Sequence, residues 1–97
     1  MYARVARWDG GEAEAIRGSA AGIKARAADG PPEGVPAKGV TILIDPENGK
    51  SMSVTFYETL EDLHEGDATL STMSPPGDGM GTRGPIEVYE VAVDRRL

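Results

Sequence analysis

The sequence contains no cysteine, which excludes disulfide bonds, thiol catalysis, iron–sulfur clusters and thiolate zinc sites together. No apolar run approaches the length of a membrane span, and the first ten residues lack the apolar segment of a secretory signal. An absence of cysteine also fits a reducing compartment. We therefore expect a cytoplasmic protein without membrane insertion.

Large side chains for a hydrophobic core are scarce. The 97 residues include one Phe, one Trp and three Tyr, and many of the apolar residues are alanine. A chain of this length buries roughly two-thirds of the surface that its unfolded form exposes, so its core is small. We expect a single domain, residues 1–97, that gains further burial by forming an oligomer.

Positive charge is in the minority. Sixteen Asp and Glu residues outnumber ten Lys and Arg residues, which gives a net charge of -6. Such a chain repels a phosphate backbone instead of releasing its counterions. The only basic cluster, Arg95 and Arg96, is too short for a tail that binds DNA. We expect no nucleic-acid partner.

Hydrophobic periodicity and turn residues predict the order strand, helix, strand, strand, helix, strand. The alanine-rich segment 12–28 predicts the first helix, and Thr59 is the predicted N-cap of a second helix that is interrupted at Gly66 and Asp67. Gly49 predicts a tight turn between the middle strands. The predicted strands are residues 2–8, 38–45, 50–58 and 86–94.

This order is that of the split β-α-β, or ferredoxin-like, arrangement: a four-stranded antiparallel sheet with two helices on one face, in the α+β class. The other face of the predicted sheet is apolar, with Leu43 on the second strand and Tyr89, Val91 and Val93 on the last. An apolar sheet face is an association surface. We therefore expect a second copy to cover it and form a homodimer.

The element order across nearly all 97 residues, the short chain and the closing strand IEVYEVAVD resemble the dimeric α+β barrel superfamily, particularly the antibiotic-biosynthesis-monooxygenase-like domains. The resemblance implies that two sheets pair face to face and form an eight-stranded, barrel-like core with the helices outside. It implies no single reaction, because the superfamily includes cofactor-independent oxygenases, haem-degrading enzymes and isomerases. The haem-degrading pattern is not matched, since the first strand carries Arg4 and no Asn.

A G-x-G-x-x-G spacing begins at Gly79. In dinucleotide-binding proteins such glycines lead from a strand into a helix N-terminus that holds the pyrophosphate. Here a helix precedes the glycines and a strand follows, so we do not expect a nucleotide site. We expect the Gly/Pro segment 74–85 to be a connector, a dimer contact or a ligand lid, with Met80 and Arg83 as its contact residues.

Several side chains combine an apolar body with a polar tip, which suits a small-molecule pocket between sheet and helices. The same residue types are enriched at dimer interfaces, so that interpretation stays open. The lone His64 lies among carboxylates, where a solvated helix face also explains it. We expect neither a metal nor a cofactor. The predicted ligand-binding residues are Arg4, Trp8, Leu43, Tyr57, His64 and Tyr89.

Three functions follow from these patterns. The first is a homodimer that binds a small aromatic or polyketide-like molecule. The second is a cofactor-independent monooxygenase, for which Trp8, Tyr57 and His64 are the candidate catalytic residues. The third is a structural dimer without a ligand. A cavity of ligand size with Arg4 or His64 directed inward would favour the first two, whereas a filled core would favour the third.

Overall fold

The computed structural model describes residues 1–73 and 79–97, which form one sheet, two α-helices and a short 3₁₀ helix. The strands are β1 Tyr2–Asp9, β2 Gly39–Asp45, β3 Lys50–Tyr57, β4 Thr82–Arg83 and β5 Glu87–Glu90. The helices are α1 Ala13–Ala27, α2 Leu60–Leu70 and the 3₁₀ helix η1 Pro46–Asn48.

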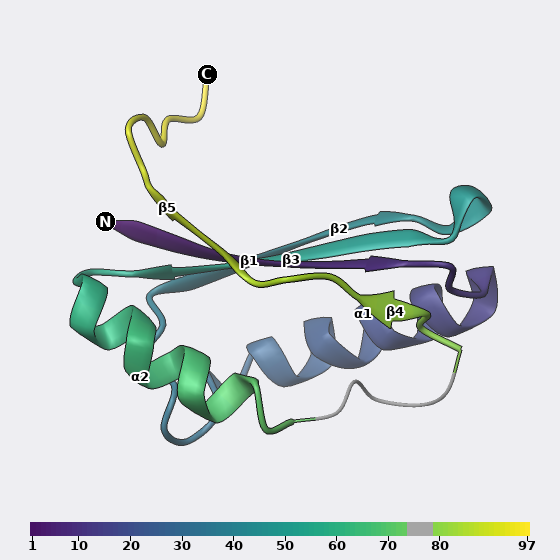
Figure 1. Cartoon of the computed structure of the whole chain (residues 1–97), viewed down its shortest axis with the longest axis horizontal. Coiled ribbons are helices and arrows are strands. Elements are labelled where there is room, and N and C mark those ends of the chain that lie inside the picture. The colour runs from purple at the N-terminus through teal and green to yellow at the C-terminus, as the bar shows by residue number, and fades with distance from the viewer. Residues whose placement is uncertain (74–78) are drawn as a thin grey trace.

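The sheet is antiparallel throughout its described pairs. The strand order is β2-β3-β1, and both β4 and β5 run along the remaining side of β1 (Figure 1). β1 pairs with β3 along almost its full length, from Tyr2 opposite Tyr57 to Trp8 opposite Ser51. With α1 and α2 on one face of this sheet, the predicted α+β class is confirmed.

The edge beside β1 contains two short strands, whereas the sequence predicted one strand over residues 86–94. β4 lies within the segment predicted as a connector, and β5 ends at Glu90, so the predicted strand is too long. β4 places Arg83 opposite Trp8, and β5 places Glu87 opposite Val5. Between these pairs β1 advances by three residues and the edge by four, so the edge holds one extra residue, as in a β-bulge. Pro85 lies in this interval and has no amide donor for the ladder, which explains the interruption.

The hairpin between β2 and β3 is confirmed. Its turn is η1, and Gly49 closes the turn with a φ of 70°, a conformation that favours glycine. Asn48 Nδ2 donates a hydrogen bond to Asp45 Oδ2 at 2.8 Å. The Gly11 amide donates to the Gly49 carbonyl at 2.9 Å, so the hairpin tip also fixes the turn that leads into α1.

Helix α2 is continuous, and the interruption predicted at Gly66 and Asp67 is wrong. Gly66 is buried against the ring of Tyr57, where an added Cβ would lie 2.5 Å from the phenolic oxygen. The glycine is therefore present for close packing and does not break the helix. The cluster beneath α2 consists of Val35, Tyr57 and Leu63, with Tyr2, Ala37 and Leu70 packed against it.

The glycines near residue 80 pack against the turn between β1 and α1. Gly79 and Gly81 have φ values of 87° and 88°, and a Cβ on Gly81 would overlap the Asp9 carbonyl oxygen. The Glu12 amide, at the start of α1, donates to the Gly79 carbonyl at 2.6 Å. The glycine spacing thus allows two backbone segments to meet closely. Residues 74–78 of the predicted connector lie outside the described residues.

Candidate functional site

Alternation along β1 assigns its side chains to the two faces of the sheet. Arg4, Ala6 and Trp8 line a cavity on the side of the helices. Tyr2 packs against the cluster beneath α2, on the same side. Tyr2, Arg4 and Trp8 therefore share the helix-facing side of the sheet. The opposite face, which we call the open face, includes Val5, opposite Val54 on β3 and Glu87 on β5. No helix lies over this face among the described elements.

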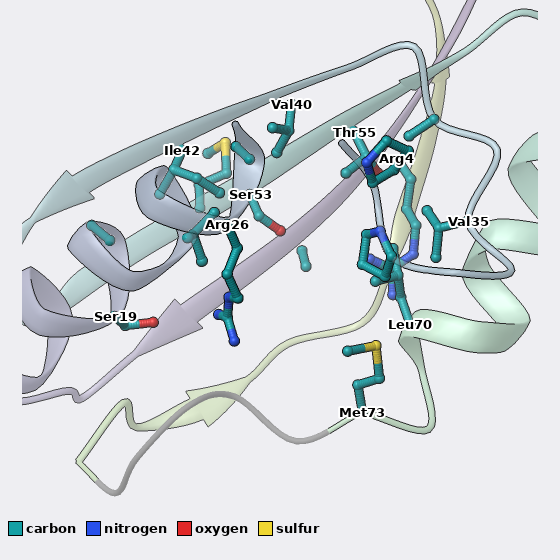
Figure 2. A pocket seen from close by; sticks show the side chains of 18 of the residues that line it. Arg4, Ser19, Arg26, Val35, Val40, Ile42, Ser53, Thr55, Leu70 and Met73 are labelled. Atoms are coloured by element: carbon teal, nitrogen blue, oxygen red, sulfur yellow. The ribbon is translucent and has the colours of Figure 1, made fainter. Parts of the chain in front are cut away.

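A cavity lies beneath the helix-facing side of the sheet. It measures about 860 Å³ and lies between α1 and the helix-facing side of β1, β2 and β3 (Figure 2). The segment before β2 and residues near β4 complete its wall. The main apolar lining residues are Ile16, Ile23, Val35, Val40, Ile42 and Leu70.

Small side chains explain why this space is open. On α1, Ser19 and Ala20 face the sheet, and on β3 the opposing positions include Ser51 and Ser53. None of these side chains is long enough to reach across the gap and close it to the packing density of an ordinary core. Beneath α2, by contrast, Tyr57 occupies the corresponding space on β3.

Hydroxyl groups alternate along the cavity floor. Ser51, Ser53 and Thr55 occupy every second position of β3 and all line the cavity. Ser51 Oγ and Thr55 Oγ1 are buried and have no hydrogen-bond partner among the described residues. Buried polar groups are normally paired with protein or ordered water, so Ser51 and Thr55 have hydrogen-bonding capacity that the described residues leave unused.

Arg4 is the buried charge of the site, with 3% of its surface exposed. Its Nε donates to Asp67 Oδ1 on α2 at 2.8 Å, and this hydrogen bond is the main reason why the pKa of Asp67 lies below its ordinary value. Arg4 Nη2 is also buried but lacks a partner in the described part of the chain. Leaving such a donor unpaired costs about 1–3 kcal/mol or more.

The cavity wall is basic although the chain is acidic. Arg4, Arg26, Lys38 and Arg83 contribute to the lining, whereas Asp29 is the acidic residue among the lining positions that the structure describes. These four cationic side chains come from β1, α1, the segment before β2 and β4. In Figure 2 the Arg26 side chain extends from α1 into the space beneath the sheet.

Two of the six predicted ligand-binding residues, Arg4 and Trp8, line the cavity. Leu43 and Tyr89 lie on the open face, where they are 52% and 49% exposed. The Tyr89 hydroxyl donates to Glu87 Oε1 at 2.7 Å on that face, which raises the pKa of Tyr89. Arg4 and Trp8 therefore lie on the helix-facing side of the sheet, and Leu43 and Tyr89 lie on the open face.

The three candidate catalytic residues occupy three different environments. Trp8 lines the cavity, Tyr57 is fully buried beneath α2, and His64 is exposed on α2. The structure therefore does not assemble Trp8, Tyr57 and His64 into one site. Their predicted catalytic roles stay predictions.

Met80 and Arg83, the predicted contact residues of the glycine-rich segment, both line the cavity. Met80 is buried, and the guanidinium carbon of Arg83 lies 5.8 Å from the centroid of the Trp8 ring, within the range of a cation–π contact. The segment thus contributes directly to the wall of the cavity.

Sequence reasoning missed the hydroxyl floor and Arg26. The signal for the floor was present in SMSVT, residues 51–55, where hydroxyl residues alternate with apolar ones. That alternation places Ser51, Ser53 and Thr55 on one face of their strand. Arg26 gave no comparable signal, because a basic residue in the last turn of a helix is ordinary in any solvated helix.

A scan against known protein families finds none that matches this chain, and a search of curated proteins finds no similar sequence. Within the described ranges no helix has the length and apolar character needed to cross a membrane. The function must therefore be argued from the cavity and the open face themselves.

Proposed function

We propose that this chain is a homodimeric, ferredoxin-like binding protein that holds a small aromatic or polyketide-like molecule in the cavity beneath its sheet. The strand order β2-β3-β1 with β4 and β5 on the far side of β1 is the one that a split β-α-β fold produces, which supports the finer fold assignment. The observation that carries the binding function is the cavity of about 860 Å³.

The cavity has the properties of a ligand site. Its volume lies in the range of roughly 300–1,000 Å³ that is usual for small-molecule pockets, and its lining is mostly apolar with a few polar groups. The flat ring of Trp8 forms part of the wall and provides a surface on which an aromatic ligand can stack. These features favour a ligand over a purely structural dimer.

Binding is favoured over monooxygenase activity because the candidate catalytic side chains do not converge. A general base must come within hydrogen-bond reach of its substrate, and His64 is exposed on α2 outside the cavity lining. Tyr57 is likewise packed in the cluster beneath α2. The cavity itself supplies an apolar surface and hydrogen-bond donors, which are the requirements for binding.

Filling the cavity from α1 tests the binding function. Ala20 lines the cavity, whereas the neighbouring Ala21 is exposed and is not among the lining residues. With neutral anthracene-2-carboxamide as the probe, we expect Ala20→Phe to weaken binding at least tenfold in calorimetric titration and Ala21→Phe to leave it unchanged. No binding to the unmodified chain, or equal binding to Ala20→Phe, would contradict the proposal.

The proposed dimer interface is the open face. Leu43 and Tyr89 are about half exposed there, and Val54 and Phe56 lie between them on the same side of β3. Beyond β5 the chain extends away from the sheet on the side opposite the helices (Figure 1), and Val93 there is 83% exposed. An apolar area of this kind indicates a partner surface.

A second copy is the proposed occupant because charged side chains of opposite sign lie opposite each other on the open face. Arg7 Nε donates to Glu87 Oε2 at 2.7 Å, and Asp45 lies opposite Lys50 in the hairpin. A two-fold interface places identical surfaces against each other, so an excess of one charge would repel. An apolar face that carries charges of both signs is suited to self-association.

Sedimentation tests this interface separately from the cavity. We expect the unmodified chain to sediment as a dimer at micromolar concentration. Leu43→Glu should give a monomer, because it buries a carboxylate in the interface. Leu60→Glu is the matched control: Leu60 is 41% exposed at the start of α2, so the dimer should persist. A monomeric unmodified chain would overturn the dimer and leave the cavity proposal standing. The cytoplasmic location stays a prediction.

A further inference from the structure

We infer that the molecule held in the cavity is a carboxylic acid, bound as its carboxylate, and that Arg4 receives this group. The inference rests on the proposed binding function and narrows it to one class of ligand. Two observations support it. Buried hydrogen-bonding groups of the cavity floor lack partners among the described residues, and the charges around the cavity are mostly positive.

The guanidinium of Arg4 is only partly used within the chain. Asp67 Oδ1 accepts from Nε, while the buried Nη2 has no acceptor among the described residues. A guanidinium presents its donors in a planar fork that matches the two oxygens of a carboxylate. The unpaired Nη2 is therefore suited to an acid group that enters from the cavity, which Arg4 lines.

Thr55 provides a second donor beside Arg4. The two residues are directly opposite each other in the β1–β3 ladder and both line the cavity, so their side chains stand side by side on its floor. Thr55 Oγ1 is buried and unpaired within the described residues. A carboxylate oxygen accepts hydrogen bonds from both groups, whereas a hydrocarbon ligand satisfies neither.

The surrounding charges favour an anion. Among the described residues, Arg26, Lys38 and Arg83 also line the cavity, and with Arg4 they outnumber Asp29 in the lining and Asp67 on α2. The wall thus has an excess of positive charge within a chain of net charge -6. Basic groups collected around one apolar space attract an acidic ligand and disfavour a cationic one.

The apolar part of the ligand has a separate place. Ile16 and Ile23 on α1 and Ile42 on β2 form a hydrophobic wall, and Trp8 lies at the cavity near Arg83. A molecule with an apolar body and one acid group satisfies both kinds of wall. Aromatic and long-chain carboxylic acids have this form.

The test compares anthracene-2-carboxylate with anthracene-2-carboxamide, which has the same shape and no charge. In calorimetric titration we expect the unmodified chain to bind the carboxylate at least tenfold more tightly. Arg4→Met should remove this preference and bind both compounds alike. Arg17→Met is the matched control, because Arg17 is exposed on α1 outside the cavity lining, and it should keep the full preference.

A second pair of variants separates ligand contact from folding. Arg4→Met leaves Asp67 without its partner, so the double variant Arg4→Met with Asp67→Asn removes both charges and relieves that defect. Asp67→Asn alone keeps the Arg4 cation and should keep the preference for the carboxylate. If Asp67→Asn loses the preference, the preference depends on the local structure around Asp67 and not on the Arg4 charge, and the role of Arg4 is overturned.

The outcomes distinguish this inference from the proposed function. Equal binding of both compounds by the unmodified chain would overturn the acid class and leave small-molecule binding intact. No binding of either would overturn both. Salt screens exposed charges far more than buried ones. If the preference for the carboxylate disappears in about 0.5 M NaCl, it arises from the exposed Arg26 and Lys38, and the role of Arg4 is overturned.

Discussion

Helices α1 and α2 cover the same face of the sheet, but only one of them closes the space beneath it. Under α2, Tyr57 and Leu63 have no exposed surface and fill the interior. Under α1, small residues such as Ala20 and Ser53 face each other across a cavity. The comparison shows that one sheet can combine a packed half, which supplies stability, with an open half, which supplies room for a ligand.

The two helices also begin differently. Thr59 Oγ1 accepts a hydrogen bond from the Asp62 amide at 3.1 Å and caps α2 within its own sequence. The Glu12 side chain makes no such bond among the described residues, and the Glu12 amide relies on the carbonyl of Gly79, far along the chain. The packed half is thus locally specified, whereas the start of α1 depends on a tertiary contact.

The largest expected effect comes from adding one methyl group to each helix. Gly66→Ala would place its Cβ 2.5 Å from the hydroxyl oxygen of the fully buried Tyr57, so we expect a loss of about 2–3 kcal/mol in the free energy of unfolding. In α1, a Cβ added at Gly22 would meet no atom of the described residues within 4 Å, so Gly22→Ala should gain about 0.5–1 kcal/mol from helix propensity. Urea unfolding measures both.

Opposite signs for the same substitution would support the contrast between the halves. A variant with Tyr57→Phe and Gly66→Ala provides the control, because removing the phenolic oxygen relieves part of the overlap. Equal effects of Gly66→Ala and Gly22→Ala would show instead that the space beneath α2 is as loosely filled as the space beneath α1.

The elements that sequence predicted well are those with local signals. Alternation in β1 and the turn at Gly49 specify a strand and a hairpin without reference to the rest of the chain. Gly66 misled the prediction because its role depends on Tyr57, nine residues away on another element. The bulge at Pro85 was missed for the same reason, since it is defined by the register with β1.

The site was predictable only in part. The pattern of a strand predicts which side chains share a face of the sheet, but it does not predict which helix covers that face. Arg4 and Tyr57 lie on the same side of the sheet, yet only Arg4 lines the cavity, since α2 covers Tyr57. Leu43 was separable from the cavity by alternation alone, because Ile42 faces the other side. The sequence alone does not predict over which pair of strands each helix lies.

A smaller effect is expected from the helix starts. Thr59→Ala removes the acceptor for the Asp62 amide, and we expect a loss of about 1 kcal/mol in the free energy of unfolding. Glu12→Ala should change it far less, because the Glu12 backbone keeps its bond to Gly79. Thermal unfolding of the two variants measures the difference. A larger loss for Glu12→Ala than for Thr59→Ala would show that α1, and not α2, depends on the side chain of its own N-cap residue.

The smallest expected effect concerns the ion pair that connects the two halves. Arg4 belongs to the cavity wall and Asp67 to α2, and their hydrogen bond lowers the pKa of Asp67 from its ordinary value of 3.8. The unfolded chain therefore takes up this proton first as the pH falls. The stabilisation is complete above that ordinary value and is lost as the pH drops through the lowered pKa of the folded state.

Because the Asp67 side chain is 35% exposed, water screens the pair, and we expect the loss to stay below about 1 kcal/mol. Urea midpoints measured from neutral pH into the acid range should fall more steeply for the unmodified chain than for Asp67→Asn, which cannot titrate. Glu65→Gln, an exposed carboxylate on the same helix, is the control and should follow the unmodified chain. Parallel curves for the unmodified chain and Asp67→Asn would mean that Arg4 gives no net support to α2, and that the two halves of the sheet are stabilised independently.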